Sequence, residues 1–317
     1  MPVLIVGAVD ARRPIVIINP RSGGGLSEPA WAKLVGPLTE GLGEFDSVFT
    51  TAPRDAMRLG AEAAREGRPL IVAFGGDGTV SEVADGVLQA GAGATTDIGL
   101  IPRGTGGDFR RSIEVPADLR EAARHIREAP ARVIDAGRVT FVDHAGATAT
   151  RHFVNVASFG FSSAVASRAN ASSKRLGGRM AFLSATMQSL VTYDNTDVWL
   201  TLDGGEPRRH RVLMAAIGNG RFFGGGMKIC PAAKLDNGTL DLVVLGDFTR
   251  MRVLTQISRV YSGNHLTLEE VSTATVRTLE AAAVDTDAIV PVELDGETPG
   301  RLPARFEVVP GALRVRF

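Results

Sequence analysis

The sequence predicts an α/β domain with a parallel sheet, followed by a domain rich in antiparallel β-strands. Between residues 14 and 134, short apolar runs alternate with helical stretches, whereas beyond residue 135 the apolar runs are separated by polar turns. Strands that alternate with helices are typical of a parallel sheet covered by helices, and strands joined by short turns pair antiparallel. A chain of 317 residues is long enough for two domains with cores of their own.

In the first half, apolar runs of strand length are followed by helical stretches. The predicted strands lie at residues 15–18, 47–50, 70–74 and 97–101. The predicted helices lie at residues 27–40, 55–66, 79–90 and 119–128. Ser27 is a residue type that caps a helix N-terminus, and Gly67 and Gly91 stand where helix C-caps are expected.

In the second half, most of the ordered segments read as strands. They lie at residues 137–143, 148–159, 197–202, 209–217, 240–245, 274–279, 288–294, 304–309 and 313–317. The run Asp203-Gly204-Gly205 between two of these strands favours a tight hairpin. Inserted helices are expected near residues 174–192 and 249–262.

The composition excludes several classes of protein. Lysine plus arginine (35) equals aspartate plus glutamate (35), whereas proteins built for nucleic acid normally carry a basic excess, so no nucleic-acid partner is expected. The single cysteine, Cys230, cannot form an intrachain disulfide and fits a reducing compartment. Because no apolar run reaches about 18 residues and the N-terminus is a poor signal peptide, the sequence predicts a cytoplasmic protein.

The most informative motif is the glycine-rich loop Gly75-Gly76-Asp77-Gly78-Thr79, which follows a predicted strand and opens a predicted helix. Glycines let the backbone approach a ligand closely, and the N–H groups at a helix N-terminus favour phosphate. A carboxylate among these donors would repel phosphate unless a cation lay between them. The loop therefore predicts binding of a magnesium–nucleotide complex rather than of a bare anion.

Two other predicted strands end in loops of the same chemical kind. Asn19-Pro20-Arg21-Ser22-Gly23 follows the first strand, and Arg103-Gly104-Thr105-Gly106-Gly107-Asp108 follows the strand at 97–101. In an open α/β sheet these strand ends face one crevice. Ordinary βα turns are the alternative, but three such loops in one sheet favour a shared ligand site.

These motifs, in this order, resemble the lipid kinases with a diacylglycerol-kinase catalytic domain, which include sphingosine and ceramide kinases. The resemblance continues through Gly224-Gly225-Gly226-Met227-Lys228-Ile229, Ala233-Lys234-Leu235-Asp236-Asn237-Gly238, Leu294-Asp295-Gly296-Glu297 and Leu302-Pro303-Ala304. It implies an N-terminal domain like those of NAD kinases and phosphofructokinases, with the active site in the interdomain cleft. The nucleotide-binding domain would comprise residues 1–136 plus about 304–317, and the lipid-substrate domain residues 137–303.

The resemblance also implies which residues bind ATP. The positions that match the family's nucleotide contacts are Asn19, Pro20, Arg21, Ser22, Gly23, Thr50, Gly75, Gly76, Gly78, Thr79, Glu82 and Thr105. Asp77 would reach the Mg²⁺ of Mg-ATP directly or through water. Turn capping is the alternative role for Asn19 and Thr105, and partnership with a helix dipole is the alternative for Glu82.

Glu297 matches the proposed proton acceptor of the bacterial diacylglycerol kinases, and Asp295 is the second candidate. A general base must lie within hydrogen-bond reach of the hydroxyl that it deprotonates. Glu297 follows an apolar strand and lies beside Gly296. The alternative is a solvated residue beside an ordinary hairpin turn.

A second, structural Mg²⁺ site is implied at Lys234, Asn237 and Thr239. Family members commonly carry Asp where this chain has Asn237, and Asn where it has Gly107. Asparagine keeps a carbonyl ligand but loses the negative charge that a hard cation favours. These two departures weaken the structural metal site and the third glycine loop.

Together these features predict an ATP-dependent lipid kinase that transfers the γ-phosphate of Mg-ATP to the hydroxyl of diacylglycerol or a related long-chain lipid. We expect transient contact with a membrane surface, for which basic and apolar residues between 168 and 183 are candidates. The protein could also form a homo-oligomer. Two alternatives remain. One is an NAD kinase, which shares the Gly-Gly-Asp-Gly-Thr loop. The other is a catalytically impaired lipid-binding or regulatory protein, which Asn237 and Gly107 keep open.

Overall fold

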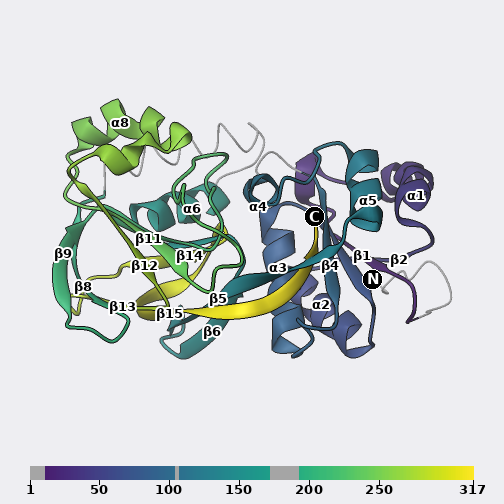
Figure 1. Cartoon of the computed structure of the whole chain (residues 1–317), viewed down its shortest axis with the longest axis horizontal. Helices are drawn as coiled ribbons and strands as arrows, with labels where there is room; N and C mark the ends of the chain where they lie inside the picture. Colours follow the sequence, from purple (N-terminus) through teal and green to yellow (C-terminus); the bar gives the residue numbers. More distant parts are fainter. Residues whose placement is uncertain (1–10, 104–106, 172–192) are drawn as a thin grey trace. The chain divides into compact units, whose positions relative to one another are not determined.

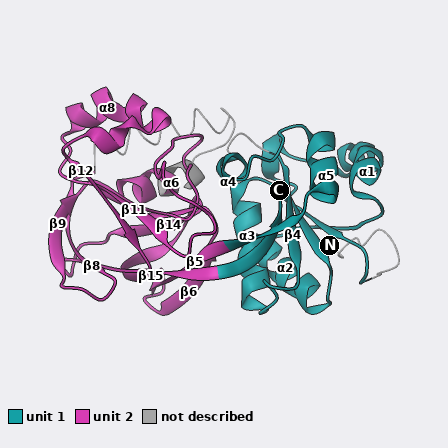
Figure 2. Ribbon diagram, in the orientation of Figure 1, with its two compact units in different colours: residues 1–134, 311–317 teal, residues 135–310 magenta. Residues whose placement is uncertain are grey.

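The computed structural model describes residues 11–103, 107–171 and 193–317 (Figure 1). These residues form two compact units (Figure 2). The first unit comprises the described part of residues 1–134 together with residues 311–317, and the second comprises the described part of residues 135–310. Two long strands, β5 (Ala131–Asp143) and β15 (Glu297–Arg316), contribute residues to both units.

The first unit contains a parallel sheet in the order β2–β1–β3–β4. Its strands are β1 (Ile15–Ile18), β2 (Asp46–Phe49), β3 (Leu70–Gly75) and β4 (Asp97–Pro102). The end of β15 adds a further parallel strand, because Arg314 pairs with Asp97 of β4. The four strands predicted for this half are confirmed to within one residue at each end.

Helices flank this sheet. They are α1 (Glu28–Leu42), α2 (Asp55–Arg65), α3 (Asp77–Gln89), α4 (Asp108–Ser112) and α5 (Leu119–Glu128). Trp31 of α1 and Ile126 of α5 share one core cluster with Phe74 of β3. Helices α2 and α3 pack closely, since a Cβ at Gly86 would lie 2.1 Å from the Met57 carbonyl oxygen. The four long helices were predicted, whereas the five-residue α4 is too short to show a helical period in the sequence.

The second unit is built from antiparallel strands, with β12–β11–β10–β7–β14–β15 as successive neighbours. Strand β13 joins β15 to β8, β8 also pairs with β9, and β5 pairs with β6 and β15. Besides β5 and β15, the strands are β6 (Thr148–Phe153), β7 (Val156–Gly160), β8 (Thr196–Leu202), β9 (Arg208–Val212), β10 (Met214–Gly218), β11 (Leu240–Leu245), β12 (Val271–Val276), β13 (Thr278–Ala283) and β14 (Pro291–Leu294).

Three predicted strands are each divided in two in the structure, those at residues 148–159, 209–217 and 274–279. At each division a backbone N–H leaves the regular ladder. The N–H of Asn155 donates to the Asp295 carboxylate, and that of Arg277 donates to the Asp203 carboxylate. The N–H of Leu213 is shared between two successive carbonyl groups. Side-chain acceptors far along the chain cause two of these breaks, so the local pattern could not show them.

Other predictions for this half have mixed outcomes. The predicted strands at 304–309 and 313–317 form the single strand β15. The predicted helix at 249–262 is confirmed as α8 (Arg250–Ser262), with Thr249 as its N-cap. The helix expected near 174–192 lies outside the described residues. Helix α6 (Phe161–Ala171) and the 3-10 helix η3 (Asn264–Thr267) were not predicted.

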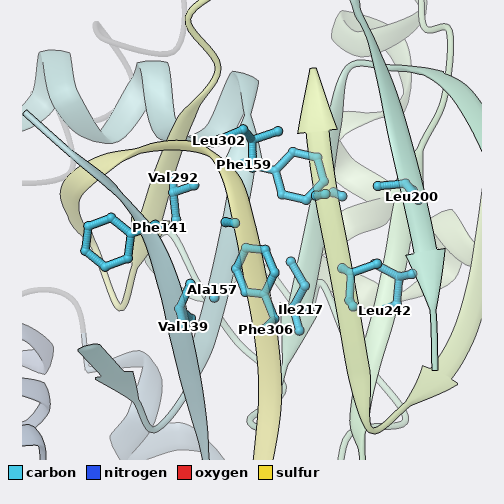
Figure 3. Packing of buried hydrophobic residues seen from close by; sticks show 14 of the residues in the cluster. Val139, Phe141, Ala157, Phe159, Leu200, Ile217, Leu242, Val292, Leu302 and Phe306 are labelled. Carbon is cyan, nitrogen blue, oxygen red and sulfur yellow. The ribbon is translucent and has the colours of Figure 1, made fainter. Parts of the chain in front are cut away.

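The core of the second unit lies between its strands (Figure 3). Phe159 of β7 and Phe306 of β15 are fully buried, with ring centroids 6.1 Å apart, and Leu200 and Leu242 belong to the same cluster. Cys230 lies in a second cluster, where burial raises the pKa of its thiol. This core supports the strands that carry the turn between β14 and β15.

Candidate active site

Three loops of the first unit lie at the carboxyl ends of neighbouring strands. β1, β3 and β4 are adjacent, with Ile18 paired to Phe74 and Phe74 paired to Ile101. The loops that follow these strands therefore reach one edge of the sheet, as the sequence predicts. Thr105 lies outside the described residues, so its nucleotide contact stays a prediction.

The first loop is shaped by the side chain of Asn19. Its Oδ1 accepts the N–H of Arg21 at 2.9 Å, and its Nδ2 donates to Oγ1 of Thr79 at 3.1 Å. The hydroxyl of Ser22 donates to the Asn19 carbonyl oxygen at 2.8 Å. The Asn19 amide thus closes its own turn and joins the first loop to the second.

Arg103 holds the glycine-rich part of the first loop. Gly24 and Gly25 have φ angles of 84° and 104°, in the region that glycine adopts without strain. Arg103 Nη2 donates to the Gly25 carbonyl at 2.8 Å, and Nε donates to the Ser22 carbonyl at 3.4 Å. The guanidinium donates to carbonyl oxygens that would otherwise repel an anion. The loop is therefore better suited to bind phosphate. Sequence reasoning missed this role, although Arg103 directly follows β4 within the third motif.

Asp77 joins the second loop to the third. Its Oδ2 accepts the N–H of Asp108 and its Oδ1 that of Phe109, each at 3.0 Å. These N–H groups begin α4, so the carboxylate caps that helix from another loop. Each carboxylate oxygen keeps a further lone pair, and Mg²⁺ in nucleotide sites commonly binds one or two carboxylates plus phosphates and water. The surroundings of Asp77 therefore fit a hydrated magnesium ion on a nucleotide.

Thr79 fixes the floor of the second loop. Its side chain is buried, and a Cβ at Gly75 would lie 2.3 Å from its Oγ1. The N–H of Arg103 donates to the Gly75 carbonyl at 2.7 Å. Gly75 is thus required by the close approach of Thr79, and both residues shape the loop on which the phosphates would rest.

Glu82 caps a neighbouring helix. Its Oε1 accepts the N–H of Arg54 and its Oε2 that of Ala56, both at 3.2 Å. These donors lie at the N-terminus of α2, whereas Glu82 belongs to α3. The structure therefore gives Glu82 the part of a helix-dipole partner, but for α2 rather than for its own helix.

Asp55 and Thr50 lie at the same end of the sheet. Burial acts to raise the pKa of Asp55, but hydrogen bonds from Thr51 and Arg58 lower it below its usual value. The N–H of Thr50 donates to the Ile18 carbonyl at 2.8 Å, which holds the end of β2 against β1. An ionised Asp55 therefore fixes the start of α2. It also helps to fix the neighbouring backbone of Thr50.

In the second unit, Asp295 anchors the turn between β14 and β15. Asp295 and Gly296 have φ angles of 47° and 95°, and positive φ at both central positions is typical of a type I′ turn. The Asp295 carboxylate accepts the N–H groups of Val154, Asn155 and Val156 at 2.9 to 3.0 Å. These charge-assisted hydrogen bonds fasten the turn to the segment between β6 and β7.

Glu293 supports the same turn from within the core. Its side chain accepts the N–H of Gly296 and the hydroxyl of Ser158, and the Ser162 hydroxyl donates to that of Ser158 at 2.8 Å. Sequence reasoning missed Glu293. The available signal is one acidic residue inside an otherwise apolar strand, because such a residue needs buried partners.

Glu297 lies directly after this turn. It pairs with Leu294 across the turn and is exposed. The carboxylates of Glu293 and Asp295 thus hold the backbone of the turn, and the turn presents the carboxylate of Glu297 at the surface. A carboxylate in this position can accept a proton from a ligand hydroxyl.

The loop predicted to bind a structural metal is held by protein groups. Asp135 accepts the N–H of Gly238 and donates its own N–H to the Leu235 carbonyl, each at 2.6 Å. The Oδ1 of Asn237 accepts the N–H of Thr239 at 3.2 Å. Asn237 therefore closes a local turn with the oxygen atom that would ligate a cation.

Comparison with known proteins identifies the family. Residues 13–139 match the diacylglycerol kinase catalytic domain, and residues 155–317 match the YegS C-terminal NAD kinase beta sandwich-like domain. A diacylglycerol kinase of Mycobacterium tuberculosis (strain ATCC 25618 / H37Rv) is 32% identical over 94% of this chain and 93% of that protein. The chain belongs to the diacylglycerol kinase and YegS-like family of lipid kinases.

Other members support this assignment. A protein of Chromohalobacter salexigens described as a YegS-like lipid kinase is 31% identical over 82% of this chain and 79% of its own length. A crystal structure from Bacillus anthracis, described as a diacylglycerol kinase, has a TM-score of 0.74 at 25% identity and covers 96% of this chain and 97% of that one. The predicted lipid kinase family and the predicted fold class, α/β followed by antiparallel β, are thus confirmed.

The residues of the predicted structural metal site do not fit a magnesium ion. Hard divalent cations favour carboxylate oxygens. Lys234, Asn237 and Thr239 would offer two backbone carbonyls and one neutral amide, and the amide oxygen already accepts a hydrogen bond. The hydroxyl of Thr239 is buried without a hydrogen-bond partner, but it adds no negative charge. We therefore derive no role for a cation at this loop of the lipid kinase.

The sequence candidate for lipid contact between residues 168 and 183 falls mostly outside the described residues. Within the described part of this lipid kinase, no helix combines the length and the apolar character needed to cross a bilayer. The membrane contact of these residues therefore stays a prediction.

Proposed function

We propose that this protein is an ATP-dependent lipid kinase that transfers the γ-phosphate of Mg-ATP to the hydroxyl of diacylglycerol or a related long-chain lipid. The observation that carries the proposal is the turn between β14 and β15. Buried and backbone-bound carboxylates hold this turn, and it presents one exposed carboxylate, Glu297. Such an arrangement suits a general base, and the glycine loops of the first unit suit a nucleotide triphosphate.

The first unit would bind the nucleotide mainly through its backbone. Asn19, Thr79 and Arg103 hold the first two loops, so their N–H groups need little reorganisation to meet phosphate oxygens. Asp77 would hold the magnesium ion of the nucleotide while its carboxylate keeps α4 in place. When bound, magnesium neutralises charge on the phosphates.

Glu297 would accept the proton of the lipid hydroxyl as the hydroxyl oxygen attacks the γ-phosphorus atom. The bond between the γ-phosphorus and the bridging oxygen breaks, ADP leaves with the electron pair of that bond, and the proton passes from Glu297 to solvent. Asp295 and Glu293 act as positioning residues, because their hydrogen bonds fix the turn and not the substrate. This division gives Glu297 a defined place without burying its charge.

Family membership supports a lipid as the acceptor. Relatives described as diacylglycerol kinases and YegS-like lipid kinases align over most of this chain. The alternative acceptor, NAD, rested on the Gly-Gly-Asp-Gly-Thr loop, and the family assignment disfavours it. A lipid acceptor also requires the protein to reach a membrane surface.

The experiment is transfer of radiolabelled phosphate from Mg-ATP to separate acceptors, namely diacylglycerol, ceramide, sphingosine and NAD. We expect a labelled lipid and no labelled NAD phosphate. Labelled NAD phosphate alone would establish the NAD kinase alternative. Nucleotide binding without any labelled product would contradict the proposal and favour a catalytically impaired lipid-binding protein.

A further inference from the structure

Helix α8 exposes an unusual amount of apolar side chain. Its inner face packs into the second unit through the buried Val260 and the partly buried Val253. On its outer face Met251, Leu254 and Tyr261 are 68%, 41% and 50% exposed, and they make up half of the large exposed hydrophobic residues in the described chain. Such clustering marks an interaction site more often than scattered exposed residues do. Figure 1 shows α8 lying along the outside of the β-rich strands.

An arginine borders this apolar face on one side. With about 100° of rotation per residue, Met251, Leu254 and Tyr261 fall within an arc of about 80°. Arg250 lies about 20° beyond Tyr261 on one side of the arc, whereas Arg259 lies about 80° beyond Met251 on the other. The helix sequence contains no acidic residue. An apolar stripe on a helix that carries arginines and no acidic residue is typical of a helix that lies in the interface of an anionic membrane.

Arg250 and Arg259 are available to phosphate groups. Arg250 pairs with Asp194 at 3.2 Å, but both side chains are more than half exposed, so the pair is weak. Arg259 donates to the Thr267 hydroxyl at 3.4 Å. The third arginine of the helix, Arg252, lies about 20° around the helix from Arg259 and pairs with Glu270 at 2.7 Å. A lipid phosphate could therefore replace the partners of Arg250 and Arg259 without breaking a buried ion pair.

A short series of hydrogen bonds connects α8 to the turn that carries Glu297. The Val260 carbonyl accepts the N–H of Lys228, which follows the glycine hairpin between Phe223 and Met227. At the start of that hairpin, the Phe222 carbonyl accepts from the Asn155 side chain at 2.6 Å. The backbone N–H of Asn155 donates to Asp295. Hydrogen bonds thus connect α8, through the glycine hairpin and Asn155, to the turn that holds the proposed base.

We propose that α8 docks this protein onto anionic lipid bilayers, with Met251, Leu254 and Tyr261 entering the interface and Arg250 and Arg259 contacting lipid phosphates. The proposal deepens the proposed function and rests on it for the choice of a lipid surface over a protein partner. The charge pattern of the stripe favours phosphatidylglycerol over neutral phosphatidylcholine. Binding is expected to weaken as salt increases.

The test is co-sedimentation with phosphatidylglycerol and phosphatidylcholine vesicles without nucleotide. We compare the native chain, a Met251→Ser/Leu254→Ser/Tyr261→Ser variant and an Arg250→Gln/Arg259→Gln variant. We expect the apolar substitutions to lower partitioning about tenfold or more on either lipid, because each removes apolar surface that the membrane interface would bury. The arginine substitutions should lower it several-fold on phosphatidylglycerol only. Ile289→Ser, which changes a residue 69% exposed elsewhere on the second unit, is the matched control and should bind as the native chain does.

Absence of vesicle binding by the native chain, or equal binding by the apolar variant, would overturn the proposal. If the native chain is instead a dimer that this variant converts to monomers, the stripe is an interface between two copies and the proposal also fails. Phosphorylation of a short-chain diacylglycerol dissolved in water separates the two proposals. Native activity on this substrate without vesicle binding overturns the docking proposal alone, whereas vesicle binding without any lipid phosphorylation overturns the proposed function alone.

Discussion

The glycine loops of the first unit and the β14–β15 turn of the second unit use polar side chains differently. In the loops, Asn19, Asp77 and Glu82 each engage backbone or side-chain groups of another segment. At the turn, Asp295 does the same, but Glu297 is exposed. The loops are therefore built to present backbone N–H groups, and the turn is built to present one side chain.

This difference indicates how to assign roles to the polar residues of a motif. A side chain with both polar atoms engaged within the protein shapes the loop, and replacing it should change stability as well as activity. An exposed side chain presented on a fixed backbone can act on the ligand, and replacing it should change activity far more than stability. The predictions below test this distinction from the largest expected effect to the smallest.

Glu297→Gln should have the largest effect on phosphate transfer and a much smaller one on folding. Removing a general base typically lowers the rate about 10²–10⁴-fold, and the amide keeps the size of the side chain. We expect kcat to fall by this factor while nucleotide affinity stays unchanged and the melting temperature changes little, because the side chain is exposed. Initial rates, nucleotide titration and thermal unfolding measure the three quantities. A drop in stability comparable to the drop in rate would place Glu297 among the shaping residues.

Asp295→Asn should lower both activity and stability. Asparagine tolerates the positive φ of this position, but its NH₂ group would face a backbone N–H that now donates to a carboxylate. An unsatisfied donor and the lost charge cost about 1–3 kcal/mol. Chemical denaturation measures this loss, and Asp236→Asn, at an exposed position, is the control. If Asp295→Asn abolished transfer with full stability, Asp295 would be the base instead of Glu297.

Asp77→Asn should weaken the contact between the second and third loops. One N–H of α4 would lose its acceptor, with an expected loss of stability of about 1 kcal/mol. Nucleotide affinity should fall in the presence of magnesium and fall much less in its absence, because the substitution removes the negative charge that would face the metal ion. Isothermal titration with and without magnesium gives both values. Equal losses under both conditions would leave Asp77 a purely structural residue.

The sequence was sufficient for the strands of the first unit and for the place of the three loops. Those features depend on local apolar runs and on glycines next to them. The partners of the loop residues depend on contacts between distant segments: Asn19 bonds a residue 60 positions away, and Asp77 bonds one 31 positions away. The partners of Asp295 lie about 140 positions away. Residue types indicated that these positions matter, but only the fold shows which backbone groups they bind.

The same reasoning applies to the loop around Asn237. Here the sequence showed the departure from the family, and the fold shows what replaces the expected charge. Asp135 and the Asn237 side chain hold the loop by hydrogen bonds to Gly238 and Thr239. The loop should therefore keep its shape in a chelator. This leads to the prediction with the smallest effect.

Without nucleotide, the melting temperature of the native chain should be the same in millimolar magnesium and in a chelator. Asn237→Asp should restore a carboxylate beside the carbonyls of Lys234 and Thr239. We expect this variant alone to gain stability on adding magnesium, by at most about 1 kcal/mol, since binding to the folded state stabilises it in proportion to ligand occupancy. Asp236→Asn serves as the control for a neighbouring change of charge. A magnesium-dependent rise in the native chain would show that the neutral Asn237 amide suffices as a ligand, and the hydrogen bonds of Asp135 would then support a metal site.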